Sequence, residues 1–143
     1  MLAIKTIFKY LLGTFLLIQL IQVDYENPPV NKHLEIQAPK EVMDILKRSC
    51  YDCHSNEVVL PWYANIAPLS WGMSRHVDLG RKWVNFSIWQ TYTDEQKDKK
   101  LEELYKSVYR VMPLQGYVAL HPKAALTKED RKLLRDWTGK APF

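Results

Sequence analysis

Two thiols and an imidazole stand within five consecutive residues of this chain, Cys50-Tyr51-Asp52-Cys53-His54. Thiols three positions apart lie on nearly the same side of one helical turn, so both can add to the two vinyl groups of one porphyrin as thioethers. The imidazole of His54 then lies beneath the ring, where it can ligate the iron. The pattern therefore predicts one covalently bound haem c per chain, and it indicates nothing about what the iron does.

Other uses of the Cys-x-x-Cys pattern fit the sequence less well. A redox dithiol normally lies at a strand-to-helix junction, and no strand-like alternation precedes Cys50. A structural zinc ion takes four ligands, whereas Cys50 and Cys53 are the only cysteines and no closely spaced histidine pair follows them. A disulfide between them would close a loop of only two intervening residues. Haem attachment is the interpretation that we favour.

A second protein ligand on the far side of the ring would make the iron six-coordinate and suited to electron transfer. Met112 is the leading candidate, because it precedes Pro113 at the end of an expected helix and lies far enough beyond His54 to return across the ring. His121, in a loop, and His76, on the apolar face of an expected helix, are the alternatives. Methionines usually fill cores and lone histidines usually form hydrogen bonds, so each assignment remains a hypothesis.

The elements that must position these side chains are helices. Apolar residues at helical spacing predict an all-α domain, cytochrome c-like, with long loops around the haem. The expected helices begin at Pro39 and run over residues 68–84, 93–112 and 127–139, with residues 112–126 as loop. The last two begin with the spacing of capping boxes, at Thr93 and Thr127. The first carries Val42, Ile45 and Leu46 on one face, so it delivers Cys50 to the core.

Residues 1–23 have the pattern of an export segment. Lys5 and Lys9 form a basic start, and residues 10–23 are apolar and uncharged. No small-x-small cleavage motif follows, and counted from Ile4 about 20 residues would suffice to span a bilayer, with the lysines reaching its interface. We therefore expect an uncleaved membrane anchor rather than a cleaved signal peptide. In either case the domain lies in the periplasm or its equivalent, where haem c is attached.

Composition limits the remaining possibilities. Residues 24–38 are polar and contain Pro28-Pro29, which is typical of an extended linker, and residues 39–143 are left as one haem c-binding domain. The formal charge of +4 includes Lys5 and Lys9, which leaves +2 for the rest of the chain. This weak basicity gives no indication of a nucleic-acid partner.

Four stretches of the domain together resemble a known family. They are residues 48–57 around the cysteine motif, residues 60–71 with Leu60-Pro61-Trp62-Tyr63, residues 80–89 with Asn85-Phe86-Ser87, and residues 112–122 with Met112-Pro113 and His121-Pro122. From Pro39 to the C-terminus the chain is similar to the small haem-binding domain proteins of Bacteroidetes-type bacteria. The resemblance implies haem c held by Cys50, Cys53 and His54, and export. The order of motif, Met-Pro and C-terminal helix is more remotely similar to class I cytochromes c.

The sequence as a whole predicts a monohaem c-type cytochrome domain that transfers single electrons with an unidentified redox partner. No carboxylate pair, nucleophile–base pair or phosphate-binding loop indicates that the protein is an enzyme. Two alternatives keep the haem but leave the sixth iron position open. One is a haem-based sensor or ligand binder, and the other is a peroxidase-like enzyme.

Overall fold

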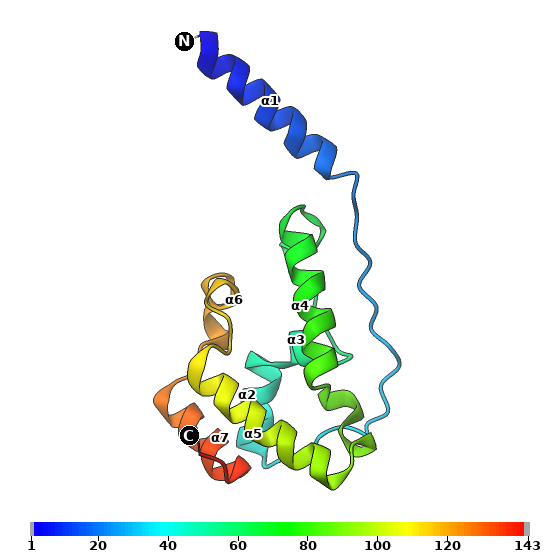
Figure 1. Cartoon of the computed structure of the whole chain (residues 1–143), viewed down its shortest axis with the longest axis vertical. Coiled ribbons are helices and arrows are strands. Elements are labelled where there is room, and N and C mark those ends of the chain that lie inside the picture. The colour runs from blue at the N-terminus through cyan, green and yellow to red at the C-terminus, as the bar shows by residue number, and fades with distance from the viewer. Residues whose placement is uncertain (1, 142–143) are drawn as a thin grey trace.

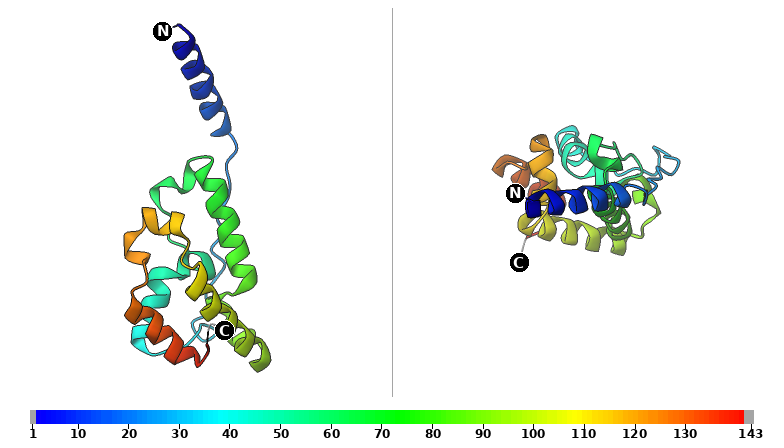
Figure 2. Two further views of the ribbon diagram at one scale, coloured as in Figure 1. Left: turned by 60° about the vertical axis from the view of Figure 1, so that its left-hand side comes forward. Right: turned by 90° about the horizontal axis from the view of Figure 1, so that it is seen from above.

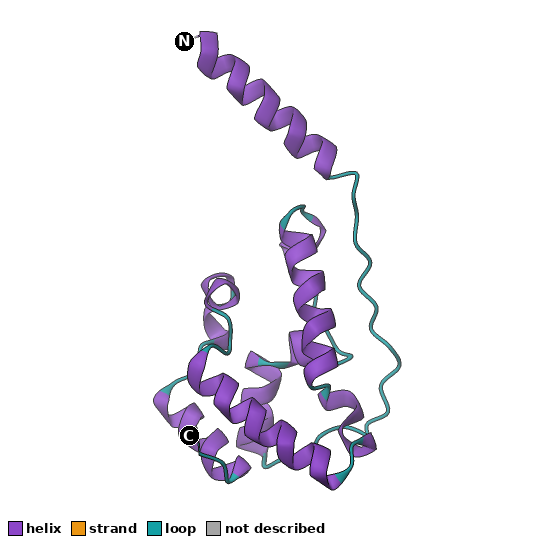
Figure 3. Ribbon diagram, in the orientation of Figure 1, coloured by secondary structure: helices purple, strands orange, loops and turns teal. Residues whose placement is uncertain are grey.

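The computed structural model describes residues 2–141, and this part of the chain folds into helices and loops without a strand (Figure 3). The expected all-α class is therefore confirmed. The α-helices are α1 (Leu2–Ile18), α2 (Lys40–Ser49), α3 (Tyr51–His54), α4 (Leu69–Trp83), α5 (Asp94–Arg110), α6 (Gln115–Leu120) and α7 (Lys128–Thr138). Short 3-10 helices are η1 (Trp62–Asn65), η2 (Phe86–Thr91) and η3 (Pro122–Ala124).

The hydrophobic core lies where α2, α5 and α7 meet. α7 packs against both α2 and α5, and α3 continues from the end of α2 toward α4 (Figure 1). Val42, Ile45 and Leu46 of α2 are buried as expected, and Cys50 packs against the same core. The helix that precedes the cysteine motif thus anchors that motif to the centre of the domain.

Local sequence signals set the ends of two helices. Thr93 accepts a hydrogen bond from the backbone of Gln96 and forms the predicted capping box at the start of α5. Thr127 and Asp130 form the second box at the start of α7. α7 ends at Gly139, whose φ of +64° is the left-handed conformation that favours glycine.

Two expectations are corrected by the fold. Residues 112–126 are not only loop, because α6 and η3 form within them. His76 does not lie on a buried face of α4: its side chain is exposed, whereas Val77 and Gly80 are buried. Fewer residues of α4 therefore face the core than the spacing of its apolar residues predicts.

The segment 24–38 runs in an extended path along the outside of the domain (Figure 1). The side chain of Asn27 makes two hydrogen bonds with the backbone of Val58, at 2.9 and 3.0 Å. Near its end the Ile36 side chain is only 2% exposed, and the Ile36 N–H donates to the carbonyl of Phe86 at 2.8 Å. The segment is thus attached to the domain at both points.

α1 extends away from the domain (Figures 1 and 2). Most of its apolar side chains are exposed. Its 17 residues correspond to about 25 Å of helix, whereas the hydrocarbon layer of a bilayer is about 30 Å thick. Among residues 2–141 no helix is long and apolar enough to cross a membrane. The membrane-spanning anchor expected from the sequence is therefore not supported.

Candidate functional site

The cysteine motif forms a single helical turn directly after α2. The N–H groups of Cys53 and His54 both donate to the carbonyl of Cys50, at 3.2 and 2.9 Å. Within the described part of the chain, neither Cys50 nor Cys53 forms a disulfide. The side chains of Cys50, Cys53 and His54 are all partly buried. The structure thus brings together the three residues that the sequence predicts to hold a haem.

The imidazole of His54 is held through one of its two nitrogens. Its Nδ1 lies 3.0 Å from the carbonyl oxygen of Gly80 and 3.1 Å from that of Val84, both at the C-terminal end of α4. Because a carbonyl only accepts, Nδ1 carries the proton and Nε2 keeps its lone pair. Burial lowers the pKa of His54, which favours this neutral form. A neutral imidazole with a free Nε2 is the form that ligates iron.

Gly80 allows α4 to approach the motif closely. A Cβ atom built on Gly80 would lie 2.3 Å from the carbonyl oxygen of Cys53 and 3.2 Å from its Cβ atom. No other residue type fits this contact without moving one of the two backbones. Gly80 therefore lets α4 bring its acceptor carbonyls to His54.

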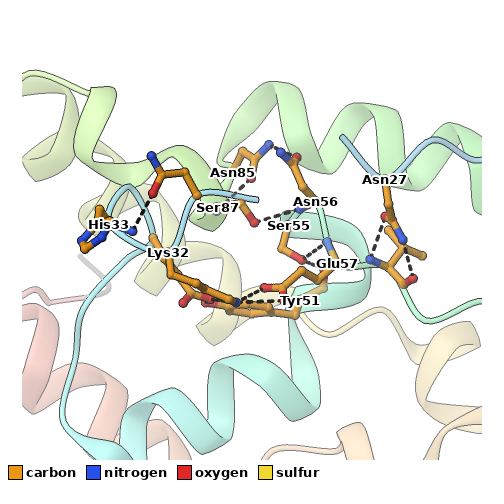
Figure 4. A network of polar contacts seen from close by, with 12 residues as sticks. Asn27, Lys32, His33, Tyr51, Ser55, Asn56, Glu57, Asn85 and Ser87 are labelled. Atoms are coloured by element: carbon orange, nitrogen blue, oxygen red, sulfur yellow. Dashed lines mark hydrogen bonds and ion pairs between the residues drawn. The ribbon is translucent and has the colours of Figure 1, made fainter. Parts of the chain in front are cut away.

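A polar network fixes the chain that leaves the motif (Figure 4). Ser55 Oγ donates to the carbonyl of Tyr51 at 2.8 Å, and the N–H of Asn56 donates to Ser87 Oγ at 3.0 Å. Asn85 Nδ2 donates to Asn56 Oδ1 at 2.7 Å. These bonds hold residues 55–56, which follow the motif, against residues 85–87, which follow α4. They keep the His54 imidazole close to the carbonyls that it bonds.

Sequence reasoning missed the part that Arg81 plays beside the motif. Its guanidinium donates to the carbonyl of Ser55 at 2.8 Å, to that of Glu26 at 2.6 Å and to Asn27 Oδ1 at 3.0 Å. One side chain thus joins α4, the loop after the motif and the outer segment 24–38. The local sequence around Arg81 does not predict these hydrogen bonds, because its partners lie 26 to 55 residues away.

A second cluster lies on the other side of the motif. Asp52, between the two cysteines, accepts a hydrogen bond from the hydroxyl of Tyr117 at 2.5 Å. The Tyr117 ring stacks on His121, with centroids 4.2 Å apart, and Tyr63 reaches His121 Nδ1 at 3.4 Å. α6 therefore contacts the motif through Tyr117, and Tyr63 of η1 contacts His121 at the end of α6. The sequence analysis predicted neither contact.

The candidates for the far-side ligand occupy different places. Met112 is partly buried against the core, in the turn between α5 and α6, and its N–H donates to the carbonyl of Ser107 at 2.8 Å. It borders a hollow of about 320 Å³ that Arg110 and Arg131 also line. His121 ends α6 within the cluster around Asp52, and His76 faces outward.

The two thiols are weak acids in this environment. Burial raises the pKa of Cys50 to about 12, with a smaller contribution from Cys53. Burial also raises the pKa of Cys53 to about 11, helped by Asp52. A catalytic dithiol instead has a thiol pKa below the usual value, because the thiolate is the nucleophile. These surroundings do not suit a thiol oxidoreductase.

The donor set of the motif fits a porphyrin. Among the residues that the structure describes, no three His, Cys, Asp or Glu side chains are grouped to hold a metal ion by themselves. One imidazole with a free Nε2 is a sufficient protein ligand where a porphyrin supplies four nitrogens, and two free thiols one turn apart match its two vinyl groups.

Comparison with known proteins supports haem binding. The family model described as a haem-binding domain matches residues 13–140 of the chain. No curated protein matches the chain, and no solved structure does.

Proposed function

This chain belongs to the haem-binding domain family, and we propose that it is a monohaem c-type cytochrome domain that transfers single electrons. The observation that carries the proposal is the arrangement of His54, whose Nδ1 bonds two carbonyls while Nε2 remains free, one turn from two free thiols. The iron of the bound haem would supply the redox couple.

Cys50 and Cys53 attach the haem in this proposal. Each thiol would hold the haem through a thioether, with its S–H added across one vinyl double bond, so that attachment would need no oxidant. The carbonyls of Gly80 and Val84 orient the His54 ring and increase the electron density at Nε2. The protein residues thus fix both the place of the porphyrin and the direction of the proximal ligand.

Met112 is the proposed distal ligand. It lies at the end of α5 and before α6, after which α7 returns to pack on α2. The proposed remote likeness to class I cytochromes c rests on the order of motif helix, methionine turn and a C-terminal helix that packs on α2. A thioether ligand raises the reduction potential and closes the sixth position, as an electron carrier requires.

We place the domain on the exported side of the membrane, in the periplasm or its equivalent. The basic start and apolar stretch of residues 1–23 support export, and bacterial haem c attachment takes place outside the cytoplasm. A separate redox protein is the expected partner.

A haem-based sensor or a peroxidase-like enzyme is the second candidate. The observation that favours it is the cluster of Tyr63, Tyr117 and His121 beside the motif. Polar groups of this kind in a distal pocket can stabilise a ligand bound to iron at an open sixth position.

One preparation of the full chain, produced with a cytochrome c maturation system, tests these assignments. The pyridine-treated, denatured protein should show covalent haem c, and the absence of that spectrum would refute the proposal. The native ferric protein should be low-spin, with a weak long-wavelength sulfur-to-iron band that disappears in Met112→Ala and persists in His76→Ala and His121→Ala. A high-spin spectrum that shifts with CO or cyanide would instead support the sensor or peroxidase-like function.

A further inference from the structure

Asp52 joins three segments that are distant in sequence. Its backbone belongs to the motif, since it lies in the turn between Cys50 and Cys53. One carboxylate oxygen accepts from the N–H of Val59 at 3.2 Å, in the loop that follows the motif. The other accepts from the hydroxyl of Tyr117 in α6 at 2.5 Å. This single side chain therefore connects the haem-attachment turn with the helix beyond Met112.

α6 has few other means of attachment. It is six residues long and none of its residues is buried, so neither intrinsic helix stability nor the hydrophobic core fixes its position. Its chief helical neighbour is η3, which follows it directly in the chain. The bond from Tyr117 to Asp52 is a charge-assisted hydrogen bond, which is stronger than a neutral one. The bond is also partly buried, which limits competition from water. Burial raises the pKa of Tyr117, so its hydroxyl stays protonated as a donor.

Tyr117 lies between the two candidates for the distal ligand that this segment carries. Met112 precedes it by five residues and His121 follows it by four. Its ring stacks on His121 at 4.2 Å, and His121 Nδ1 lies 3.1 Å from its carbonyl. A contact that holds Tyr117 in place therefore also restrains the whole segment 112–121, because Tyr117 lies near its middle.

We propose that the Asp52–Tyr117 hydrogen bond holds the distal-ligand segment 112–121 against the haem-attachment turn. Asp52 and Tyr117 are positioning residues in this inference, and neither touches the iron. The inference rests on the proposed haem site and adds to it the contact that keeps the sixth position closed. Loss of this contact should ease displacement of the distal ligand by an added one.

The test titrates imidazole into the ferric full-length protein matured with haem. Tyr117→Phe removes only the hydroxyl and keeps the ring on His121, and Asp52→Asn keeps an acceptor for Val59 but removes the charge. Both should bind imidazole about tenfold more tightly than the wild type, the effect of losing one charge-assisted hydrogen bond. Tyr25→Phe is the matched control, because its hydroxyl donates to the carbonyl of Ser70, away from α6. It should bind as the wild type does.

A second readout needs no haem. In haem-free protein, Tyr117→Phe should speed amide hydrogen exchange in residues 112–121 and leave α5 and α7 unchanged. Unchanged exchange there, unchanged imidazole affinity, or an equal gain in Tyr25→Phe would overturn the inference, as would a wild-type protein whose sixth position is already open. A protein without covalent haem would refute the proposed function, while hydrogen exchange would still decide the role of the Asp52–Tyr117 bond.

Discussion

The position of the His54 imidazole depends on the close approach of Gly80 to the cysteine motif. His54 directs Nδ1 at the carbonyls of Gly80 and Val84, and these belong to the end of α4. The C-terminal end of a helix carries a partial negative charge, which would suit the proposed role of this imidazole as an electron-donating ligand of iron. The contact exists only because Gly80 has no side chain at the point where α4 crosses the backbone of Cys53.

Gly80→Ala should therefore damage the protein despite the higher helix propensity of alanine. The added methyl group would lie 2.3 Å from the Cys53 carbonyl oxygen, so α4 or the motif must shift. We expect the free energy of unfolding to fall by about 1–3 kcal/mol, the usual range for overpacking. The yield of covalent haem should fall with it. Denaturant unfolding and the pyridine haemochrome spectrum measure the two effects.

Gly72→Ala is the control for this prediction, because Gly72 lies in the same helix with nothing within 4 Å of the added Cβ atom. It should stabilise the protein by about 0.5–1 kcal/mol through helix propensity alone. Equal behaviour of the two variants would show that α4 does not need its close approach to the motif.

At the scale of elements, α2 and α7 form the part of the domain that supports the motif. Leu46 of α2 and Leu134 of α7 are fully buried in the shared core. Arg48 reaches from the end of α2 to Asp130 in the first turn of α7, at 2.7 Å. Asp130 also accepts from the N–H of Thr127, so one carboxylate both caps α7 and ties it to α2.

Asp130→Ala should lower the stability in a pH-dependent way. Burial would raise the pKa of Asp130, but hydrogen bonds from Thr127 and Arg48 outweigh it and hold the pKa below its usual value of 3.8. A depressed pKa gives stability that is present above pH 4 and is lost as the pH falls through the folded-state value. We expect the variant to lose about 1 kcal/mol at pH 7. The difference from the wild type should shrink as the pH falls below 3.8 and Asp130 becomes protonated in the folded protein, as measured by denaturant unfolding.

Asp136→Ala controls for the general loss of an acidic group from α7. Among the residues that the structure describes, Asp136 pairs with Lys132 and Arg135 of the same helix. Its replacement should have a smaller effect at every pH. A loss at Asp130 that does not depend on pH would contradict the electrostatic explanation.

How far the sequence predicts these elements depends on the range of the interactions. The capping boxes at Thr93 and Thr127 and the stop at Gly139 are local signals, and they predicted the ends of α5 and α7 well. The cysteine motif is local too, so its spacing alone predicts Cys50, Cys53 and His54 as the haem-binding residues, and that assignment stays a prediction. The bonds of Asp52 to Tyr117 and of His54 to α4 join residues 26 to 65 positions apart. No periodicity in a single sequence reveals such pairs.

On the scale of the whole molecule, the segment 24–38 behaves as part of the folded domain. Ile36 belongs to the same core cluster as Leu46 and Leu134. Arg81 donates hydrogen bonds to the Glu26 carbonyl and to Asn27 Oδ1, and Asn27 Nδ2 donates to the Val58 carbonyl. The outer segment therefore connects α4 with the loop after the motif. By contrast, the apolar side chains of α1 are mostly exposed. Just after α1, Gln19 and Ile21 form hydrogen bonds with Ala67 and Trp71.

Removal of residues 1–23 should therefore leave the stability nearly unchanged when another export signal directs the protein. Removal of residues 1–38 should instead cost more than about 3 kcal/mol, since it takes Ile36 out of the core and breaks the bonds to Asn27. Denaturant unfolding of the two matured proteins measures the difference. If the shorter protein does not fold, Ile36→Ala gives the same information and should cost about 2–5 kcal/mol, with the exposed neighbour Gln37→Ala near zero. Equal stability of the two truncated proteins would mean that residues 24–38 are only a tether, and that the haem domain folds from residue 39 onward without them.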